Sequence, residues 1–403
     1  MKEKESVKGL KRKISERVRR IRGSGIREFF DIAQRMEDVI SLGVGEPDFT
    51  TPWSAREACI YALEKGYTSY TSNWGLLELR QTISDMLYKE MGVFYDPESE
   101  IIVTTGVSEA ADIAIRAIVD PGDEVIVHEP SYVSYKPCTI FAGGSPVSVR
   151  TSVEEDFRLT ADALEESISE KTKALVLNYP NNPTGAILRR KDLEEIADVV
   201  VEHDLIVISD EIYGKLTYEG KHVSIASLDD DLKERTILLN GFSKAHAMTG
   251  FRIGFAAANA EIIEAMMKIH QYVMLCAPTP AQIAALEAIR DENSVERMIS
   301  EYNRRRKLMV AGLREIGLEC FEPKGAFYAF PSIASTGMSS EEFARRLLFE
   351  ERVVVVPGSV FGEAGEGFVR CAYALSQQKI REALARIENF LQRHGQKHTT
   401  SHS

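Results

Sequence analysis

The sequence predicts an α/β protein that has a mostly parallel sheet in a large domain and a smaller α+β lobe. Short β-branched runs alternate with longer amphipathic stretches between about residues 100 and 260. Apolar strands flanked by helices are typical of a parallel sheet that is buried on both faces. After about residue 290, long helical patterns surround only short apolar runs, which indicates a change of architecture. A chain of 403 residues is long enough for both cores.

In the large domain, each expected strand is a short apolar run rich in β-branched residues. The expected strands are Ile101–Thr104, Glu124–His128, Ala174–Asn178, Leu205–Ser209, Thr236–Asn240 and Ile253–Ala257. Helical patterns such as Ser108–Val119 and Lys191–His203 lie between several of them. Ligands of such sheets bind at the carboxyl ends of the strands. The residues that follow the strands are therefore the candidates for chemistry.

The smaller lobe is expected from the C-terminal third of the chain. Its helical patterns are Ser294–Leu313, Ser340–Phe349 and Ser376–Leu391, and its short strands are Phe327–Phe330, Val353–Val356 and Phe368–Cys371. We expect the large domain to span residues 46–290. Residues 1–45 are expected to join residues 291–403 in the small domain.

Charge and cysteine usage limit the partners and the compartment. The chain has 49 Lys and Arg against 61 Asp and Glu, a formal net charge of −12, which argues against binding to nucleic acid. No apolar stretch is long enough for a membrane span or a signal-peptide core. The five cysteines are scattered and form no CxxC pair, as in reduced proteins. We therefore expect a cytoplasmic protein with no metal site and no membrane partner.

The N-terminal segment is basic and amphipathic. The first 27 residues carry eleven Lys and Arg against three Glu, with apolar residues at helical spacing. An organelle transit peptide or a membrane-surface helix would show this pattern. The interpretation that we favour is a helix laid over the body of the protein or over a partner subunit. The polar tail from about Arg393 is expected to be frayed.

Two turns after expected strands suit the binding of polar groups. Thr105–Ser108 contains a glycine and leads at once into a helix, and such a turn presents free backbone N–H groups that bind anions. The alternative is a structural turn in which Ser108 caps the helix. The turn Asn178–Gly185 contains two prolines and a glycine, and its Asn182 offers both a donor and an acceptor.

Charged residues follow two further strands. Asp210 ends an apolar run, where a carboxylate is costly unless it meets a cation such as a protonated pyridine nitrogen; a core arginine or a helix cap are the alternatives. Lys244 follows Thr236–Asn240 among small residues, where desolvation would leave a neutral amine nucleophile. Arg252, eight residues further on, suits bidentate binding of a phosphate. Most lysines are solvated surface charges, so this interpretation of Lys244 depends on the whole pattern.

With these residues in order, the chain resembles the class I and II aminotransferases of fold type I. The matching strings, which cover essentially the whole chain after residue 25, are Ser41–Phe49, Tyr70 before Gly75, Asn182–Gly185, Asp210–Tyr213, Ser243-Lys244, Met248–Arg252, Gly325–Tyr328, Val356–Gly358 and Val369-Arg370. The resemblance implies a fold-type I transferase with a mostly parallel seven-stranded sheet. It also implies pyridoxal 5'-phosphate as the cofactor.

The resemblance implies a role for each residue around the cofactor ring. Lys244 would bind the cofactor covalently and then transfer the substrate proton as general base and acid. Asp210 would keep the pyridine nitrogen protonated, so that the ring remains an electron sink. Tyr213 and Asn182 would hydrogen-bond the ring oxygen, and Tyr132 would stack on the ring face.

The resemblance also implies how the phosphate is held. Arg252, Ser243 and the backbone amides of Val107 and Ser108 would bind it, together with Tyr70 of the partner subunit. A site that the partner subunit completes makes a homodimer obligatory for activity.

At the substrate end, Arg370 would grip the α-carboxylate as a fork. Asn182 and the backbone near Gly43 would assist it. The substrates implied are an L-amino acid and a 2-oxo acid.

Two positions depart from the family pattern. Many relatives have a serine where this chain has Gly241, so phosphate binding would depend more on Arg252, Ser243 and the helix N-terminus. One aspartate-using branch has a lysine at the position of Ser108 to grip the distal carboxylate, and a serine cannot do so electrostatically. The overall similarity to archaeal aromatic and aspartate aminotransferases, and to bacterial enzymes acting on N-acetyl-diaminopimelate, leaves the substrate open.

Two other classes of protein share the cofactor residues. Lyases and decarboxylases of this fold include β-C–S lyases, which would form pyruvate and ammonia without an amino acceptor. Transcription regulators that sense the cofactor need a DNA-binding domain, for which about 25 preceding residues are too few. We therefore expect an aminotransferase that moves the amino group of aspartate or an aromatic amino acid to a 2-oxo acid such as 2-oxoglutarate by a ping-pong mechanism. An N-acetyl-diaminopimelate aminotransferase and a β-C–S lyase are the alternatives.

Overall fold

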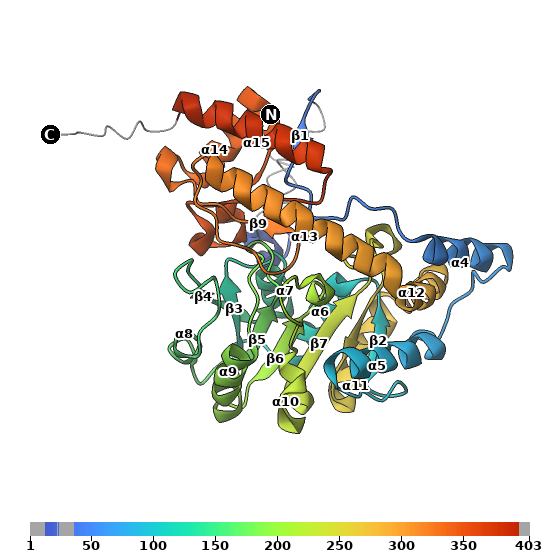
Figure 1. Ribbon diagram of the computed structural model, residues 1–403. Coiled ribbons are helices and arrows are strands. Elements are labelled where there is room, and N and C mark those ends of the chain that lie inside the picture. The colour runs from blue at the N-terminus through green and yellow to red at the C-terminus, as the bar shows by residue number, and fades with distance from the viewer. Residues whose placement is uncertain (1–12, 22, 24–35, 395–403) are drawn as a thin grey trace, which may run out of the picture.

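A seven-stranded sheet lies at the centre of the larger part of the computed structural model, which describes residues 13–21, 23 and 36–394 (Figure 1). Its strands are β2 (Ile101–Thr104), β3 (Glu124–Glu129), β4 (Ser145–Arg150), β5 (Thr172–Asn178), β6 (Ile206–Asp210), β7 (Thr236–Gly241) and β8 (Gly254–Ala257), in the order β2-β8-β7-β6-β5-β3-β4. Only β8 in this sheet runs antiparallel to its neighbours. The predicted α/β fold with a mostly parallel sheet is confirmed.

The edge strand β4 is one that the apolar runs of the sequence do not predict. It pairs only with β3, and most of its residues are half-buried or exposed. An edge strand with one solvated face needs no continuous apolar run, and it tolerates a proline such as Pro146. The other strands of this sheet agree with the predicted ranges to within two residues.

Successive residues of each strand point to opposite sides of the sheet, so apolar strands leave two apolar faces. Helices cover both of these faces. The helices of this part of the chain are α4 (Trp53–Glu64), α5 (Leu77–Met91), α6 (Val107–Ile118), α7 (Tyr135–Ala142), α8 (Ala161–Glu165), α9 (Arg190–Glu202), α10 (Asp230–Arg235), α11 (Ala260–Val273) and α12 (Thr279–Arg290). Of these, α4 packs mainly on α12 rather than on the sheet. Val127 and Val176 pack with α6 and α11, whereas Ile126 and Leu175 pack with α9 on the other face.

The C-terminal third forms a second group of elements, drawn in orange and red in Figure 1. Its helices are α13 (Glu292–Glu315), α14 (Ser340–Glu351) and α15 (Gln377–His394). A three-stranded antiparallel sheet joins β11 (Val356–Pro357), β12 (Val369–Ala372) and β9 (Tyr328–Ala329), and β1 (Ile40–Ser41) pairs in parallel with β10 (Val353–Val354).

Short 3-10 helices occur in both parts of the chain. They are η1 (Gly214–Leu216), η2 (Ile225–Ser227), η3 (Thr249–Phe251), η4 (Ala334–Thr336), η5 (Gly358–Phe361) and η6 (Glu363–Gly365).

The single strand predicted at Val353–Val356 is wrong. Two short strands replace it, because β10 pairs with β1 whereas β11 pairs with β12. The chain changes partner at Val355, which an uninterrupted run of valines does not reveal.

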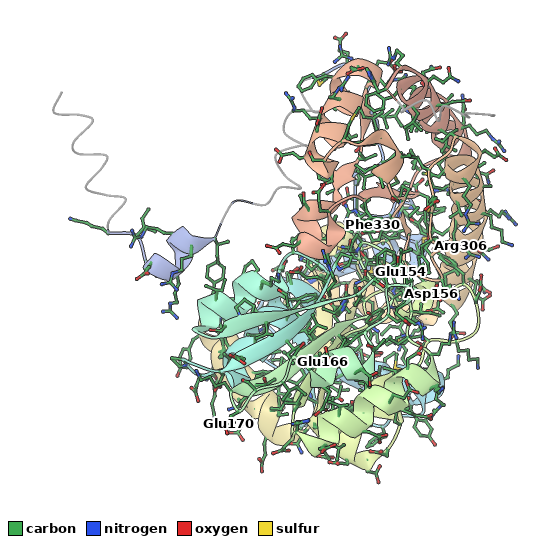
Figure 2. All side chains as sticks on the ribbon, turned by 90° about the vertical axis from the view of Figure 1, so that its left-hand side faces the viewer. Glu154, Asp156, Glu166, Glu170, Arg306 and Phe330 are labelled. Atoms are coloured by element: carbon green, nitrogen blue, oxygen red, sulfur yellow. The ribbon has the colours of Figure 1, made fainter. Side chains whose placement is uncertain are left out.

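An aromatic cluster joins the C-terminal elements to the large sheet. Phe330 lies between these two groups (Figure 2) and stacks on Phe368 at a centroid distance of 5.1 Å. It also meets the edge of Phe157, which belongs to the same apolar core as Leu175 and Leu177 of β5. The C-terminal elements are thus held against the sheet by buried apolar contacts.

Most of the basic N-terminal segment, residues 1–12, 22 and 24–27, and the tail residues 395–403 lie outside the described residues. The described piece contains α2 (Glu16–Arg20), and the guanidinium of Arg17 donates a 3.1 Å hydrogen bond to the carbonyl of Phe141 after α7. Among the helices that the structure describes, none has the length and apolarity needed to cross a membrane.

Candidate active site

A cavity of about 810 Å³ opens where β5, β6 and β7 end. The predicted site residues that line it are Val107, Ser108, Tyr132, Asn182, Asp210, Tyr213, Ser243, Lys244, Arg252 and Arg370. They come from strand ends, from the start of α6 and from β12. Gly43 and Tyr70, which were also predicted as site residues, are not among the lining residues.

Lys244 lies in the turn after β7 and points across the cavity. Its Nζ donates a 2.7 Å hydrogen bond to the carbonyl of Gly45, a contact that the sequence did not reveal. Burial, and after it the positive charge of Arg370, lowers the pKa of the Lys244 amine to about 8. The neutral amine, which is the nucleophile, is therefore accessible near physiological pH.

Asp210 ends β6 and is 5% exposed. Its Oδ2 accepts a 2.7 Å hydrogen bond from the hydroxyl of Tyr135, and its Oδ1 accepts one from the amide of Ile212 at 3.1 Å. Burial raises the pKa of Asp210 to about 6, although both hydrogen bonds act to lower the pKa. A cation placed against this carboxylate would stabilise its charged form.

Tyrosines form the walls beside Lys244. The hydroxyls of Tyr213 and Tyr328 share a 2.8 Å hydrogen bond, and burial raises the pKa of both, so both remain protonated at neutral pH. Tyr132 also lines the cavity, where its ring meets Tyr135 edge-on at a centroid distance of 5.8 Å. The hydroxyls can therefore donate hydrogen bonds to a ligand, and the rings offer apolar faces.

One end of the cavity presents groups that can bind an anion. The turn Thr105–Ser108 leads into α6, whose N-terminal cap is Gly106 rather than Ser108, so the capping role considered for Ser108 is wrong. A Cβ at Gly106 would lie 2.7 Å from Nη2 of Arg252, so only glycine lets the guanidinium approach the turn this closely. Ser243 lines the same cavity, and these N–H, hydroxyl and guanidinium groups suit a phosphate.

Packing explains the glycine at position 241. A Cβ at this position would lie 2.8 Å from Cα of Gly254 and 3.2 Å from Cγ2 of Val107. The strands β7 and β8 and the first turn of α6 therefore approach too closely for any side chain.

The opposite end of the cavity holds Arg370, which is 2% exposed. Its Nη1 donates to Oδ1 of Asn182 at 2.9 Å, and its Nη2 donates to the carbonyl of Gly43 at 2.7 Å. The guanidinium also lies 4.5 Å from the ring centroid of Tyr328. Its Nε is buried with no hydrogen-bond partner in the described part of the chain. The fork is thus held in place with donor capacity to spare for a carboxylate.

Tyr70 lies outside the cavity of its own chain and is 81% exposed. The residues on either side of it are tied to α12, because Thr279 donates to the carbonyl of Ser69 at 2.7 Å and Gln282 donates to the hydroxyl of Thr71 at 3.0 Å. The segment is therefore held so that Tyr70 projects into solvent.

Several residues of the site were not among the predicted ones. Tyr135, Tyr328 and Gly45 contact the predicted residues directly. Asn178 joins two of them, since its Nδ2 donates to the carbonyl of Asp210 and its Oδ1 accepts from the amide of Asn182, both at 3.3 Å. The position of Asn178 at the end of a strand was a usable signal. The contacts of Tyr135 and Gly45 depend on tertiary packing.

The family model of the class I and II aminotransferases matches residues 37–387. The Bacillus subtilis protein YugH is 55% identical over 379 residues, which cover 94% of this chain and 98% of YugH. An aspartate aminotransferase of Pyrococcus abyssi is 51% identical over 382 residues, which cover 94% of this chain and 98% of the relative. The crystal structure of an aromatic aminotransferase from Pyrococcus horikoshii shares 50% identity with a TM-score of 0.87, covering 91% of this chain and 99% of that chain.

These matches define a class of enzyme. The chain belongs to the class I and II aminotransferase family, and the protein is an aminotransferase with the fold-type I architecture. Membership implies pyridoxal 5'-phosphate as the cofactor, and amino acids and oxo acids as the substrates. The predicted family and enzyme class are confirmed.

Proposed function

We propose that this aminotransferase binds pyridoxal 5'-phosphate at Lys244 and moves the amino group of aspartate or an aromatic L-amino acid to a 2-oxo acid such as 2-oxoglutarate. The observation that carries the proposal is one cavity in which a partly neutral amine, a buried carboxylate and a buried guanidinium lie together. The two half-reactions would use the same cavity in turn, as a ping-pong mechanism requires.

The cofactor, when bound, supplies an aldehyde for the amine and a ring that draws electrons from the substrate α-carbon. Asp210 would hold a proton on the ring nitrogen, because its buried carboxylate gains from a cation. The hydroxyl of Tyr135 and the amide of Ile212 would keep the Asp210 oxygens oriented. Tyr132 would pack on the ring face.

Lys244 would act as the general base and acid, taking a proton from the substrate α-carbon and returning it on the cofactor side. Because its pKa is lowered, the Lys244 amine can both accept and donate a proton near neutral pH. Tyr213 and Asn182 would hydrogen-bond the ring oxygen. The oxygen of Asn182 accepts from Arg370, which leaves its NH₂ group to donate.

The charged groups at the two ends would fix the register of the ligands. The phosphate would be bound by Arg252, Ser243 and the amides of Val107 and Ser108. Gly241 has no side chain and would contribute no hydroxyl to it. Arg370 would bind the substrate α-carboxylate, positioned by Asn182 and the Gly43 carbonyl. The guanidinium fork then orients the α-carbon toward Lys244.

The lining of the cavity bears on which substrate side chain is preferred. Among the described residues that line the cavity, the cations are Lys244, Arg252 and Arg370, and each has another task. A distal carboxylate would meet hydroxyls such as that of Ser108, whereas an aromatic ring would meet tyrosines. This favours an aromatic donor over aspartate, with an N-acetyl-diaminopimelate derivative as the alternative.

A donor panel with 2-oxoglutarate as the acceptor tests the substrate. It should contain aspartate, phenylalanine, tyrosine, alanine and diaminopimelate derivatives. We expect the highest kcat/KM for the aromatic amino acids, and a higher value for aspartate would overturn that preference. Pyruvate and ammonia formed from a sulfur amino acid without any acceptor would favour a β-C–S lyase instead.

We also propose an obligatory homodimer in which Tyr70 of the partner subunit reaches the phosphate. Tyr70 is exposed in its own chain, and so are Tyr272 and Val273 at the end of α11. Sedimentation should give a mass near twice 45.0 kDa. Tyr70→Phe should weaken cofactor binding within an intact dimer, and a fully active monomer would contradict the proposal.

We further propose that residues 46–290 form the large domain and residues 1–45 with 291–403 the small one. The pairing of β1 with β10 supports the grouping of the two chain ends. We place the enzyme in the cytoplasm, since the cysteines Cys59, Cys138, Cys276, Cys320 and Cys371 are free thiols. As its partners we propose the substrates and a second copy of the chain, with neither nucleic acid nor a membrane among them.

The central test is Lys244→Ala. The variant should lose the visible absorbance of the bound cofactor and nearly all turnover, because no other amine faces Gly45 and Asp210 in the described cavity. Its sedimentation should match that of the wild type, which checks the fold. A cofactor adduct that borohydride still fixes to the variant would overturn the assignment of Lys244.

A further inference from the structure

Behind the proposed phosphate site lies a buried acidic residue that the mechanism does not use. Glu109 is the third residue of α6, directly after the turn Thr105–Ser108. Its Oε2 accepts a hydrogen bond from the backbone amide of Thr105, so the side chain reaches back and braces the turn. Only 9% of the Glu109 side chain is exposed.

The second oxygen of Glu109 is held by a histidine from another helix. Nδ1 of His270, on α11, lies 2.6 Å from Oε1 of Glu109. The His270 side chain is 0% exposed, and its Nε2 has no hydrogen-bond partner in the part of the chain that the structure describes. Glu109 is thus the one polar contact of the His270 ring among the described residues.

The position of Glu109 creates an electrostatic conflict. A phosphate bound at the amides of Val107 and Ser108 would lie within one helical turn of the Glu109 carboxylate, and like charges repel in a poorly solvated site. The positive end of the α6 dipole and Arg252 favour the phosphate, but the carboxylate opposes both. A hydrogen-bond donor to the carboxylate reduces this opposition.

We propose that His270 is a positioning residue for the cofactor phosphate, acting through Glu109. Its Nδ1–H draws the carboxylate away from the phosphate and fixes the rotamer in which Glu109 braces Thr105. The turn then keeps its amides directed into the cavity. The inference rests on the proposed phosphate site, and it adds a contact from α11 to that site.

Substitutions at the two positions separate charge from shape. In His270→Asn, the amide nitrogen can occupy the place of Nδ1 and still donate, whereas His270→Leu fills similar space without a donor. In Glu109→Gln, an amide oxygen can still accept from Thr105, but the charge is gone. His203→Leu is the matched control, since His203 pairs with Glu165 at 2.8 Å on the surface, far from the turn in sequence.

The readout is the affinity of the apoenzyme for inorganic phosphate and for pyridoxal 5'-phosphate, measured by calorimetry. His270→Leu should weaken both about tenfold, since a hydrogen bond to a charged group contributes roughly one order of magnitude in affinity or more. His270→Asn should stay within about threefold of the wild type, and His203→Leu should not change the affinity. Thermal unfolding of each apoenzyme checks the fold.

The double variant decides whether Glu109 mediates the effect. When Glu109→Gln is already present, His270→Leu should cost less than about twofold in affinity, because no carboxylate remains to be restrained. An equal loss in both backgrounds, or wild-type affinity in His270→Leu, would overturn the proposal and leave His270 as a packing residue. If the wild-type apoenzyme binds neither ligand, the proposed function itself fails, which is a separate outcome.

Discussion

The two ends of the cavity each present an arginine, but the arginines are held in different ways. Arg370 is almost fully buried and is fixed by Asn182, the Gly43 carbonyl and the face of Tyr328. Arg252 is exposed, has a positive φ of 52°, and donates to the carbonyl of Thr249 at 3.0 Å. The Arg370 end, which we propose for the substrate carboxylate, is therefore organised before a ligand arrives. The Arg252 end, which we propose for the phosphate, is shaped mainly by backbone and left open.

The reason for the difference lies in what each end must recognise. A substrate enters and leaves in every cycle, so a fixed fork reduces the ordering that each binding event requires. A cofactor binds once, and a backbone turn at a helix N-terminus can hold its phosphate with little help from side chains. We therefore expect the two arginines to respond very differently to substitution.

Among substitutions at the two ends of the cavity, the largest effect is expected from Arg370→Gln. Truncating a buried, hydrogen-bonded charge costs about 2–5 kcal/mol, so kcat/KM should fall on the order of a thousandfold for every α-carboxylate substrate. Steady-state kinetics with an aromatic donor and with aspartate measures this loss. A loss confined to one of the two donors would show that Arg370 recognises the side chain instead.

The next effect concerns the pH dependence of Lys244. Because burial and then Arg370 lower the pKa of Lys244 to about 8, the neutral amine predominates above that pH and is depleted about tenfold for each unit below it. The rate of cofactor incorporation into the apoenzyme should therefore rise from pH 6 and level off above about pH 8. In Arg370→Gln the midpoint should move upward, since one of the causes of the lowered pKa has been removed. A midpoint near 10 in the wild type would contradict this environment of the amine.

A smaller effect is expected from Arg252→Gln. In the proposed site the exposed guanidinium would share the phosphate with Ser243 and the α6 amides, so cofactor affinity should fall about tenfold, within the range for one hydrogen bond to a charged group. At saturating cofactor, kcat should stay close to the wild-type value. A thousandfold fall in kcat would mean that the two ends of the cavity are not as different as the contacts indicate.

The smallest effect on binding is expected from Gly241→Ser. The added atoms meet Gly254 and Val107, so the apoenzyme should lose about 1–3 kcal/mol of stability, as overpacked sites do. Thermal unfolding measures that loss, and calorimetry should find no gain in phosphate affinity. Tighter phosphate binding without loss of stability would show that the strands have room for the serine.

The same contrast separates what the sequence could predict from what it could not. The phosphate end follows from local patterns, because Thr105–Ser108, Ser243 and Arg252 come directly after or close to apolar strands. The carboxylate end depends on contacts across the chain. Gly43 lies 327 residues from Arg370, and only the resemblance to a family brought the two together.

Contacts within the fold explain the remaining differences. Tyr135 is an unremarkable helix residue in the sequence, and only packing brings its hydroxyl to Asp210. His270 carries no sequence signal either, since its partner Glu109 lies 161 residues away. The edge strand β4 lacks an apolar run, and the partner exchange at Val355 is invisible in a row of valines. The spacing of apolar residues indicates which positions are buried, but it does not show which neighbouring element covers them.

The most direct test of the central claim is to locate the covalent attachment of the cofactor. The wild-type enzyme would be loaded with pyridoxal 5'-phosphate, reduced with borohydride, digested and examined by mass spectrometry. We predict one label per chain, on Lys244. A label on a different lysine, or a label spread over surface lysines while Lys244 stays free, would contradict the assignment of this cavity as the active site.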